Sequence, residues 1–200
     1  MKLIFATNNQ HKVEEIQAAI GTEFEIVSLH DAKIRIDIPE PHNTLEANAS
    51  EKSSVIHKLT DMNCFSEDTG LEVEALGGEP GVKSARYAGA KKSFEDNIKK
   101  LLARLENSPD RKARFRTVIS LIWNDKEYLF EGACDGQILK EKKGDGGFGY
   151  DPVFIPNGSG KSFAEMTLEE KNNYSHRKKA ADKLVSFLRE QECKNGKGET

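Results

Sequence analysis

The start of the chain alternates between strand-like and helix-like patterns, and this restricts the fold more than any later segment. Residues 2–7, KLIFAT, form an apolar run that suits a buried strand. Within residues 9–21, apolar side chains recur at helical spacing, and Gly21 can end the helix. Residues 24–29, FEIVSL, supply the next strand. This order and spacing predict a βαβ unit, in which the two strands run parallel.

The rest of the chain adds antiparallel strands and further helices. Residues 114–123 and 127–139 flank the turn NDK and predict an antiparallel hairpin, while residues 64–78 are expected to form two strands around an acidic turn. Four more helices are expected to begin at capping residues, namely Thr44, Ser93, Thr167 and Ser175. We therefore expect one α/β domain over residues 1–193, with a mixed β-sheet flanked by helices, and a flexible tail over residues 194–200.

Composition and charge exclude several classes of partner. The formal net charge of −3 argues against duplex nucleic acid, whose binders carry a basic excess. No segment approaches the roughly 20 apolar residues of a membrane span, and the start lacks a signal-peptide pattern. The three cysteines, Cys64, Cys134 and Cys193, are far apart and lack metal-ligand spacing. We expect a cytoplasmic protein with reduced thiols that binds neither nucleic acid nor membranes.

Residues 144–152, GDGGFGYDP, contain the Gly-x-Gly-x-x-Gly spacing of dinucleotide-binding loops. Such a loop requires a buried strand before it and a helix after it. Here the preceding residues are charged, and Pro152 with the β-branched residues after it opposes a helix. Two interpretations remain. The glycines let the backbone approach a flat ligand on which Phe148 stacks while Asp151 orients it or holds a metal, or Phe148 belongs to the core.

Two helices are expected to begin with cations, against their own dipoles. Lys12 lies in the first turn of one, and His176, Arg177 and two lysines occupy the first turn of the last. Helix N-termini favour anions, so an anion bound between the two helix starts would explain the pattern. The alternative is that these are exposed cations with a small cost to each helix.

Carboxylates at two positions are candidates for metal binding and proton transfer. Glu67 and Asp68 are adjacent, so only one of them is expected to face a site, and an exposed acidic turn is an equal alternative. Glu40, in the proline-broken segment DIPEPHN, is a second candidate with a weaker local signal. An enzyme that acts on phosphates needs such groups to hold Mg²⁺ and to accept a proton from water.

Four blocks of the chain, in order and at sensible spacing, resemble the inosine triphosphatase family of noncanonical purine nucleoside triphosphate pyrophosphatases. They are TNNQHK, EDTGLEVEALGGEPGVKSARYAG, GGFGYDPVF and EMTLEEKNNYSHRKKA. The resemblance implies a fold of two lobes with an active-site cleft between them. It implies Mg²⁺-dependent hydrolysis of inosine, deoxyinosine and xanthosine triphosphates to the monophosphate and pyrophosphate, usually by a homodimer.

The resemblance also implies roles for individual residues. Glu40 and Asp68 would bind Mg²⁺, and Asp68 would be the general base. Lys52 would match the family's lysine on the second helix, and Thr69 would touch the ligand. The triphosphate would be contacted by Thr7, Asn8, Asn9, Gln10, His11 and Lys12. The wall beside the base would be formed by Phe148, Gly149, Tyr150 and Asp151, and the purine would be read by Lys171, His176 and Arg177.

The resemblance also bears on base selection, on one departure from the family pattern and on alternative functions. A donor from His176 or Arg177 would favour a 6-oxo purine over adenine, and Arg177→Ala is expected to harm this discrimination more than stability. Ala47 stands where many family members have Glu, which leaves Glu46 without an assigned role. The alternative functions are a pyrophosphatase for other modified nucleotides and a nucleotide-binding sensor that has lost catalysis.

Overall fold

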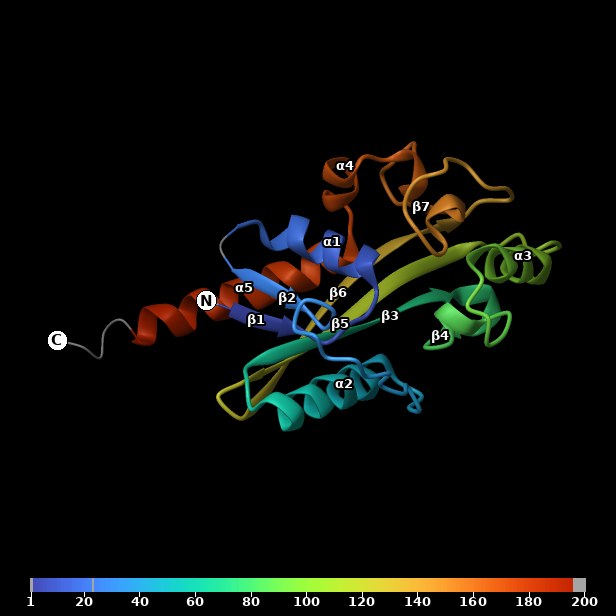
Figure 1. Cartoon of the computed structure of the whole chain (residues 1–200). Helices are drawn as coiled ribbons and strands as arrows, with labels where there is room; N and C mark the ends of the chain where they lie inside the picture. The colour runs from blue at the N-terminus through green and yellow to red at the C-terminus, as the bar shows by residue number, and fades with distance from the viewer. Residues whose placement is uncertain (1, 23, 196–200) are drawn as a thin grey trace.

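A computed structural model describes residues 2–22 and 24–195, and in this part of the chain the strands form one seven-stranded mixed sheet (Figure 1). The strand order is β2-β1-β3-β5-β6-β7, with β4 paired to β3. The predicted mixed sheet flanked by helices is confirmed. The strands are β1 (Lys2–Phe5), β2 (Glu25–Ser28), β3 (Cys64–Val73), β4 (Pro80–Gly81), β5 (Lys112–Trp123), β6 (Lys126–Ile138) and β7 (Phe154–Pro156).

The helices begin where the sequence predicts. Each of the four predicted capping side chains accepts a backbone N–H three residues on, with Thr44 bound by Ala47 at 3.2 Å as an example. The helices are α1 (Gln10–Ile20), α2 (Leu45–Thr60), α3 (Phe94–Arg104), α4 (Leu168–Asn172) and α5 (His176–Asn195), with short 3₁₀ turns η1 (Glu74–Leu76), η2 (Ser84–Arg86), η3 (Asp151–Val153) and η4 (Phe163–Glu165). Helix α5 thus crosses the predicted domain boundary at residue 193, and residues 196–200 of the predicted tail lie outside the described residues.

The predicted βαβ unit and hairpin are both present. Strands β1 and β2 pair in parallel, with Ile4 opposite Val27. Strands β5 and β6 pair antiparallel along their lengths around Asn124 and Asp125, whose φ values of 50° and 62° suit the tight turn of a hairpin. No helix in the described part of the chain is both long enough and apolar enough to span a membrane.

The predicted acidic turn at Glu67 and Asp68 is wrong, because β3 runs unbroken through both residues. The parallel pairing of β3 with β1 ends at Phe65, but antiparallel pairing with β5 continues over all ten residues of β3. Glu67 and Asp68 therefore extend past the carboxyl end of β1, where ligands bind in α/β sheets. Since neighbours in a strand point to opposite faces, the two carboxylates serve different surroundings.

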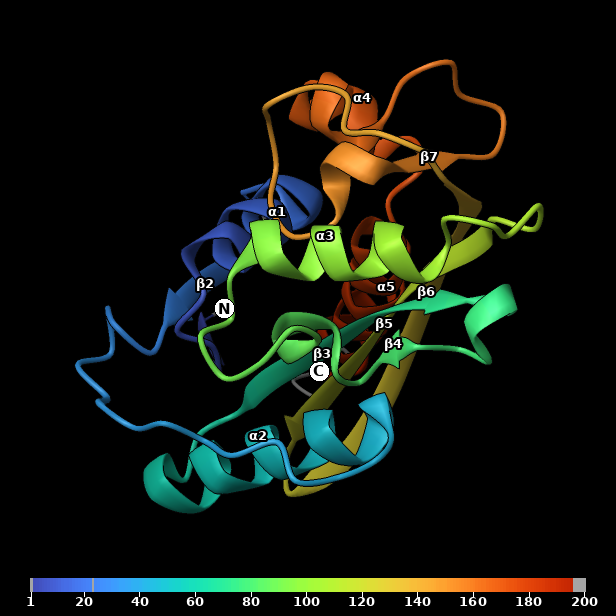
Figure 2. The ribbon, with the colours of Figure 1, turned by 90° about the vertical axis from the view of Figure 1, so that its right-hand side faces the viewer.

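Helices cover both faces of the sheet, and the two largest hydrophobic cores of the described residues lie along it. Figure 1 shows α1 and α5 on one face and α2 on the other. The first core joins β1, α1 and α5 to the middle of the sheet through residues such as Phe5, Ile16 and Leu184. The second gathers α3, the far end of β3 and β7 around Phe115 and Phe154. Figure 2 looks onto this second end, where α3 lies across the molecule between β4 and the orange segment of β7 and α4.

Candidate active site

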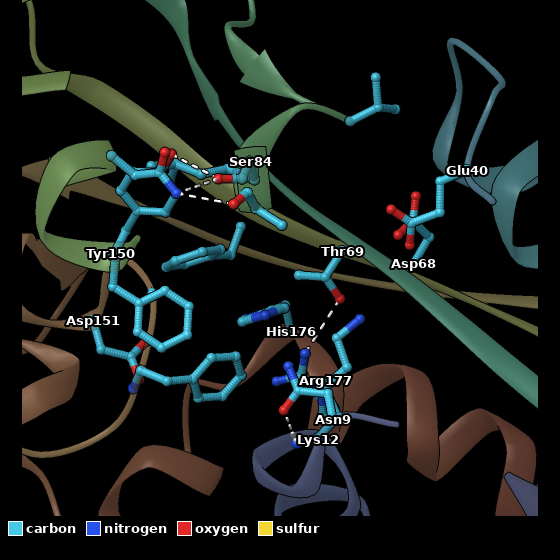
Figure 3. Close-up of a pocket in the computed structure, with 18 of the residues that line it drawn as sticks. Asn9, Lys12, Glu40, Asp68, Thr69, Ser84, Tyr150, Asp151, His176 and Arg177 are labelled. Atoms are coloured by element: carbon cyan, nitrogen blue, oxygen red, sulfur yellow. Dashed lines mark hydrogen bonds between the residues drawn. The ribbon is translucent and has the colours of Figure 1, made fainter. Parts of the chain in front are cut away.

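Two neighbouring cavities, which share part of their walls, form the candidate site. The aromatic cavity, of about 120 Å³, is bounded by β3, β5, α3 and the loop at 148–151 (Figure 3), and its walls include Leu71, Ser84, Phe94, Asn97, Phe115, Phe148, Tyr150, His176 and Arg177. The cationic cavity, of about 730 Å³, lies at the end of β1, and its walls include Thr7, Asn8, Asn9, Lys12, Glu40, Lys52, Arg86 and Lys92. Asn9, Lys12, Glu40, Ala85 and Phe94 belong to both walls.

Lys52 forms ion pairs with both candidate metal ligands, Glu40 and Asp68. The Nζ atom of Lys52, on α2, lies 2.8 Å from Glu40 Oε1 and 3.2 Å from Asp68 Oδ1. Asp68 lines the aromatic cavity, Lys52 the cationic cavity and Glu40 both, so this cluster stands at their junction. Figure 3 shows Glu40 and Asp68 side by side, apart from the aromatic side chains.

The charges of this cluster are set by burial and by its neighbours. Burial raises the pKa of Asp68 above its usual value, and Lys52 opposes this only in part. Burial also disfavours the ionised form of Glu40, but Lys52, Lys12 and Arg86 outweigh it and lower its pKa to about 2. Burial acts against the charge of Lys52, yet Asp68 and Glu40 raise its pKa. Of the two carboxyls, Asp68 is the one whose affinity for a proton is raised.

The anion between the two cationic helix starts belongs to the protein itself. Glu67 is buried, and its oxygens accept hydrogen bonds from Arg177 Nε at 2.7 Å and Nη2 at 2.9 Å. Lys12 Nζ lies 3.1 Å from the same carboxylate. Although burial favours a protonated Glu67, these two cations lower its pKa. The expected anion is therefore present, and it is a side chain of β3.

Arg177 and Lys171 also form ion pairs with buried carboxylates. Arg177 is 2% exposed and binds Glu15 as well as Glu67, while Lys171 Nζ lies 2.7 Å from Glu15 and 2.6 Å from Asp151. Removing one partner of such a buried pair commonly costs about 3–5 kcal/mol. We therefore expect Arg177→Ala to reduce stability first, which is the opposite of the ranking expected from the sequence.

His176 is the exception among the buried polar groups at this site. Its ring stacks on Phe115 with centroids 4.7 Å apart, and burial together with Arg177 and Lys171 lowers its pKa well below the usual value. Within the described residues, its Nδ1 is the buried side-chain nitrogen or oxygen that has no hydrogen-bond partner. A buried polar atom without a partner costs free energy unless a ligand or water satisfies it. His176 therefore presents a neutral, unsatisfied ring nitrogen in the wall of the aromatic cavity.

The glycine-rich loop places Phe148 at the cavity and not in the core. Phe148 is half-buried, stacks on His11 with centroids 5.2 Å apart, and its backbone N–H donates to Asp151 Oδ2 at 3.0 Å. Gly147 has φ +69°, and a Cβ there would meet that same oxygen at 2.1 Å, so the turn requires glycine. Asp151 is buried and bound to Lys171 and this N–H, so it orients the loop.

All but two of the predicted site residues line one or both of the cavities. Gln10 and His11 are exposed and line neither cavity. Sequence reasoning missed Glu15, Asn48, Ser84 and Arg86. Asn48 Nδ2 donates to Asp68 at 3.2 Å, and its position one helical turn before Lys52 is a signal that could have revealed it. The others depend on contacts between segments far apart in the sequence.

The site offers two carboxylates to a metal rather than a complete set of ligands. Among the described residues, three or more potential ligands converge at His57, Asp61 and Asp125, near the end of α2 and the hairpin turn, and not at Glu40 and Asp68. Mg²⁺ is commonly bound by one or two carboxylates together with substrate phosphates and water. Glu40 and Asp68 fit that kind of site, with the cationic cavity beside them to receive phosphates.

Comparison with known proteins agrees with this geometry. The model of the Ham1 family matches residues 3–187. The dITP/XTP pyrophosphatase of Porphyromonas gingivalis is 52% identical over 188 residues, covering 94% of this chain and 97% of that protein, and the one from Flavobacterium johnsoniae is 48% identical, covering 94% and 98%. The structure of the Staphylococcus aureus Ham1 protein superposes with a TM-score of 0.86 at 38% identity, covering 96% of this chain and 100% of that one. The family match and these relatives span nearly the whole fold, both cavities included, and the chain belongs to the Ham1 family.

Proposed function

We propose that the protein hydrolyses noncanonical purine nucleoside triphosphates, namely ITP, dITP and XTP, to the nucleoside monophosphate and pyrophosphate. The observation that carries this proposal is the junction of the two cavities. A base can stack in the aromatic cavity while its triphosphate extends into the cationic cavity, past Asp68 and Glu40. The relatives named dITP/XTP pyrophosphatase support the same chemistry.

Base selection is assigned to His176. The neighbouring donors of Lys171 and Arg177 are held by carboxylates, whereas His176 Nδ1 has no partner. A proton on Nδ1 would donate to the 6-oxo group of hypoxanthine or xanthine and would meet an N–H donor in adenine. A site built to satisfy such a hydrogen bond discriminates strongly, because the wrong base leaves a buried group unpaired.

Asp68 is assigned the role of general base. Its carboxylate is fixed by Asn48 and Lys52, and its raised pKa makes it a better proton acceptor than an ordinary aspartate. Lys12 and Lys52 flank the path of the triphosphate and stabilise charge that redistributes during phosphoryl transfer.

Mg²⁺ is proposed as the cofactor, held by Glu40 and Asp68 and by oxygens of the substrate. When bound, it would polarise the phosphate and lower the pKa of water. Glu40 suits this role because it stays ionised to about pH 2 and would exchange its contact with Lys52 for the cation.

A homodimer in the cytoplasm is proposed as the working form. Large apolar side chains are exposed around the end of α2 and the hairpin of β5 and β6, at Leu59, Met62 and Leu129. Such a patch suits an interface between copies. The buried, unpaired thiols of Cys64 and Cys134 suit a reducing compartment. Light scattering after size-exclusion chromatography tests the dimer, and a monomer at micromolar concentration would refute it.

The activity is tested by incubating the protein and Mg²⁺ with inosine, deoxyinosine, xanthosine, adenosine, guanosine and methylated pyrimidine triphosphates. Pyrophosphate and orthophosphate are measured separately. We expect pyrophosphate from the inosine and xanthosine substrates alone. Release from a methylated pyrimidine nucleotide would keep the chemistry and refute the base assignment, and tight binding without release would identify a sensor.

A further inference from the structure

Arg86, at the end of η2, binds Glu40 on the segment that precedes α2. Its Nη1 donates to Glu40 Oε2 at 3.0 Å, and its Nη2 donates to the backbone oxygen of Glu40 at 2.9 Å. Glu40 stands between Pro39 and Pro41 in a segment without helix or strand, and neither proline has an N–H to donate. One guanidinium thus holds both the side chain and the backbone of a candidate metal ligand.

The backbone of Arg86 is fixed to the wall of the aromatic cavity. Arg86 ends η2, and Ser84 at its start binds three separate elements. The Ser84 carbonyl accepts hydrogen bonds from Tyr150 Oη at 2.9 Å and from Asn97 Nδ2 at 3.3 Å, and its hydroxyl accepts the N–H of Leu71 at 2.9 Å. These partners all line the aromatic cavity. The position of Arg86 is therefore set by the residues that would surround the base.

We propose that Arg86 is a positioning residue that keeps Glu40 at a fixed place relative to the base cavity. This inference rests on the proposed function. With Glu40 so held, Glu40 and Asp68 would present their carboxylates to a cation at a fixed place relative to the base cavity, and the phosphates of a bound nucleotide would be aligned with Asp68. Small errors in the placement of reacting groups reduce rates by large factors, so this alignment matters for turnover.

The two-pronged contact requires arginine. Lysine keeps the charge but is a single point donor, and it cannot bind the carboxylate and the backbone oxygen together. Lys52, Lys12 and Lys92 already supply positive charge to the cationic cavity. Arg86→Lys therefore keeps the positive charge near Glu40 but loses the two-pronged contact that fixes its position. Arg86→Gln removes the charge as well as the contact.

The experiment measures Mn²⁺ affinity by electron paramagnetic resonance in the presence of a non-hydrolysable inosine triphosphate analogue, together with steady-state turnover, IMP affinity and melting temperature. Removal of groups that orient metal ligands commonly costs about 10–100-fold in metal affinity or activity. We expect Mn²⁺ affinity and kcat to fall about tenfold or more in both Arg86→Lys and Arg86→Gln, with IMP affinity within about twofold of wild type. Arg104→Gln is the matched control, because Arg104 is also an arginine paired with a glutamate, Glu79 at 3.0 Å, and lines neither cavity.

Four outcomes are decisive. Unchanged Mn²⁺ affinity in both Arg86 variants would overturn the proposal, as would full rescue by lysine. A parallel loss of IMP affinity and thermal stability would also overturn it, by showing that Arg86 supports the fold around the aromatic cavity. A wild-type protein that releases no pyrophosphate from any nucleotide would instead refute the proposed function, and the Mn²⁺ titration would still report on the contact with Glu40.

Discussion

Glu67 and Asp68 are neighbours on β3, but replacing each by its amide is expected to change melting temperature and turnover in different ways. For Asp68→Asn, the sign follows from the raised pKa of the carboxyl. A carboxyl whose pKa is higher in the folded state is harder to ionise there, so above its unfolded value of about 3.9 its charge costs stability. Asparagine removes that cost at pH 7, and its oxygen can still accept from Lys52. The change also takes one of two carboxylate partners from buried Lys52, which keeps Glu40, so the melting temperature of Asp68→Asn should stay close to that of wild type.

Glu67→Gln should instead lower the melting temperature. Here Arg177 and Lys12 lower the pKa of the carboxyl against the effect of burial, so its charge stabilises the folded state. The change leaves Arg177, 2% exposed, with Glu15 as its remaining carboxylate partner. Breaking a buried pair in this way costs about 3–5 kcal/mol. At about 2–4 °C per kcal/mol for a chain of this length, the melting temperature should fall by on the order of 10 °C.

Turnover is a second property that distinguishes Asp68→Asn from Glu67→Gln. Loss of a general base reduces turnover by about 10²–10⁴-fold, so Asp68→Asn should be folded and nearly inactive. Differential scanning calorimetry and pyrophosphate release from inosine triphosphate measure the two properties in parallel. Full turnover in a folded Asp68→Asn protein would refute its assigned role. A melting temperature lowered as far as in Glu67→Gln would show that the Asp68 carboxylate supports the fold.

Two further predictions test the aromatic cavity and the buried pairs. Phe148→Ala removes a base stack that contributes about 1–3 kcal/mol, so KM for inosine triphosphate should rise by about 5–150-fold with little change in melting temperature, and an unchanged KM would exclude stacking. The lowered pKa of Glu67 makes its stabilising contribution complete above its unfolded value of about 4.3 and lost as the pH falls toward its folded pKa. Urea unfolding from pH 7 to pH 3 should therefore show stability falling below about pH 5 in wild type and a flatter profile in Glu67→Gln, whereas identical profiles would contradict the assignment.

The parts of the fold that sequence predicted are those decided by local chemistry. The cap at Thr44, the hairpin turn at Asn124 and the βαβ start each depend on residues within one segment. The error at Glu67 and Asp68 has a physical cause. Two adjacent carboxylates read as a turn, but pairing with β5 and compensation by Arg177 and Lys52 outweigh the local preference. Those partners lie too far along the chain for any local pattern to reveal them.

The dependence on contacts between distant segments also limits what sequence can predict about the site. Motif resemblance located Asp68, Lys52 and His176, but not the state of their charges. That His176 is neutral and unsatisfied follows from burial against Phe115 and from the cations beside it. The close packing of α5 on β6 contributes to this burial, since a Cβ on Gly132 would meet the His176 carbonyl at 2.1 Å. Neither fact has a sequence signal of its own.

The pairing of charges explains why the substrate should need a divalent cation. The cations near the described site are largely balanced, because Lys12, Lys52, Arg86, Lys171 and Arg177 are paired with Glu15, Glu40, Glu67, Asp68 and Asp151. Lys92 adds one further positive charge to the wall of the cationic cavity. A bare triphosphate carries several negative charges, so these side chains alone would leave most of its charge unbalanced in a partly desolvated site. We therefore expect pyrophosphate release to fall by more than about 100-fold after treatment with EDTA and to return with added Mg²⁺. Full turnover by the metal-depleted protein would show that the side chains separate from their carboxylates to bind the phosphates directly.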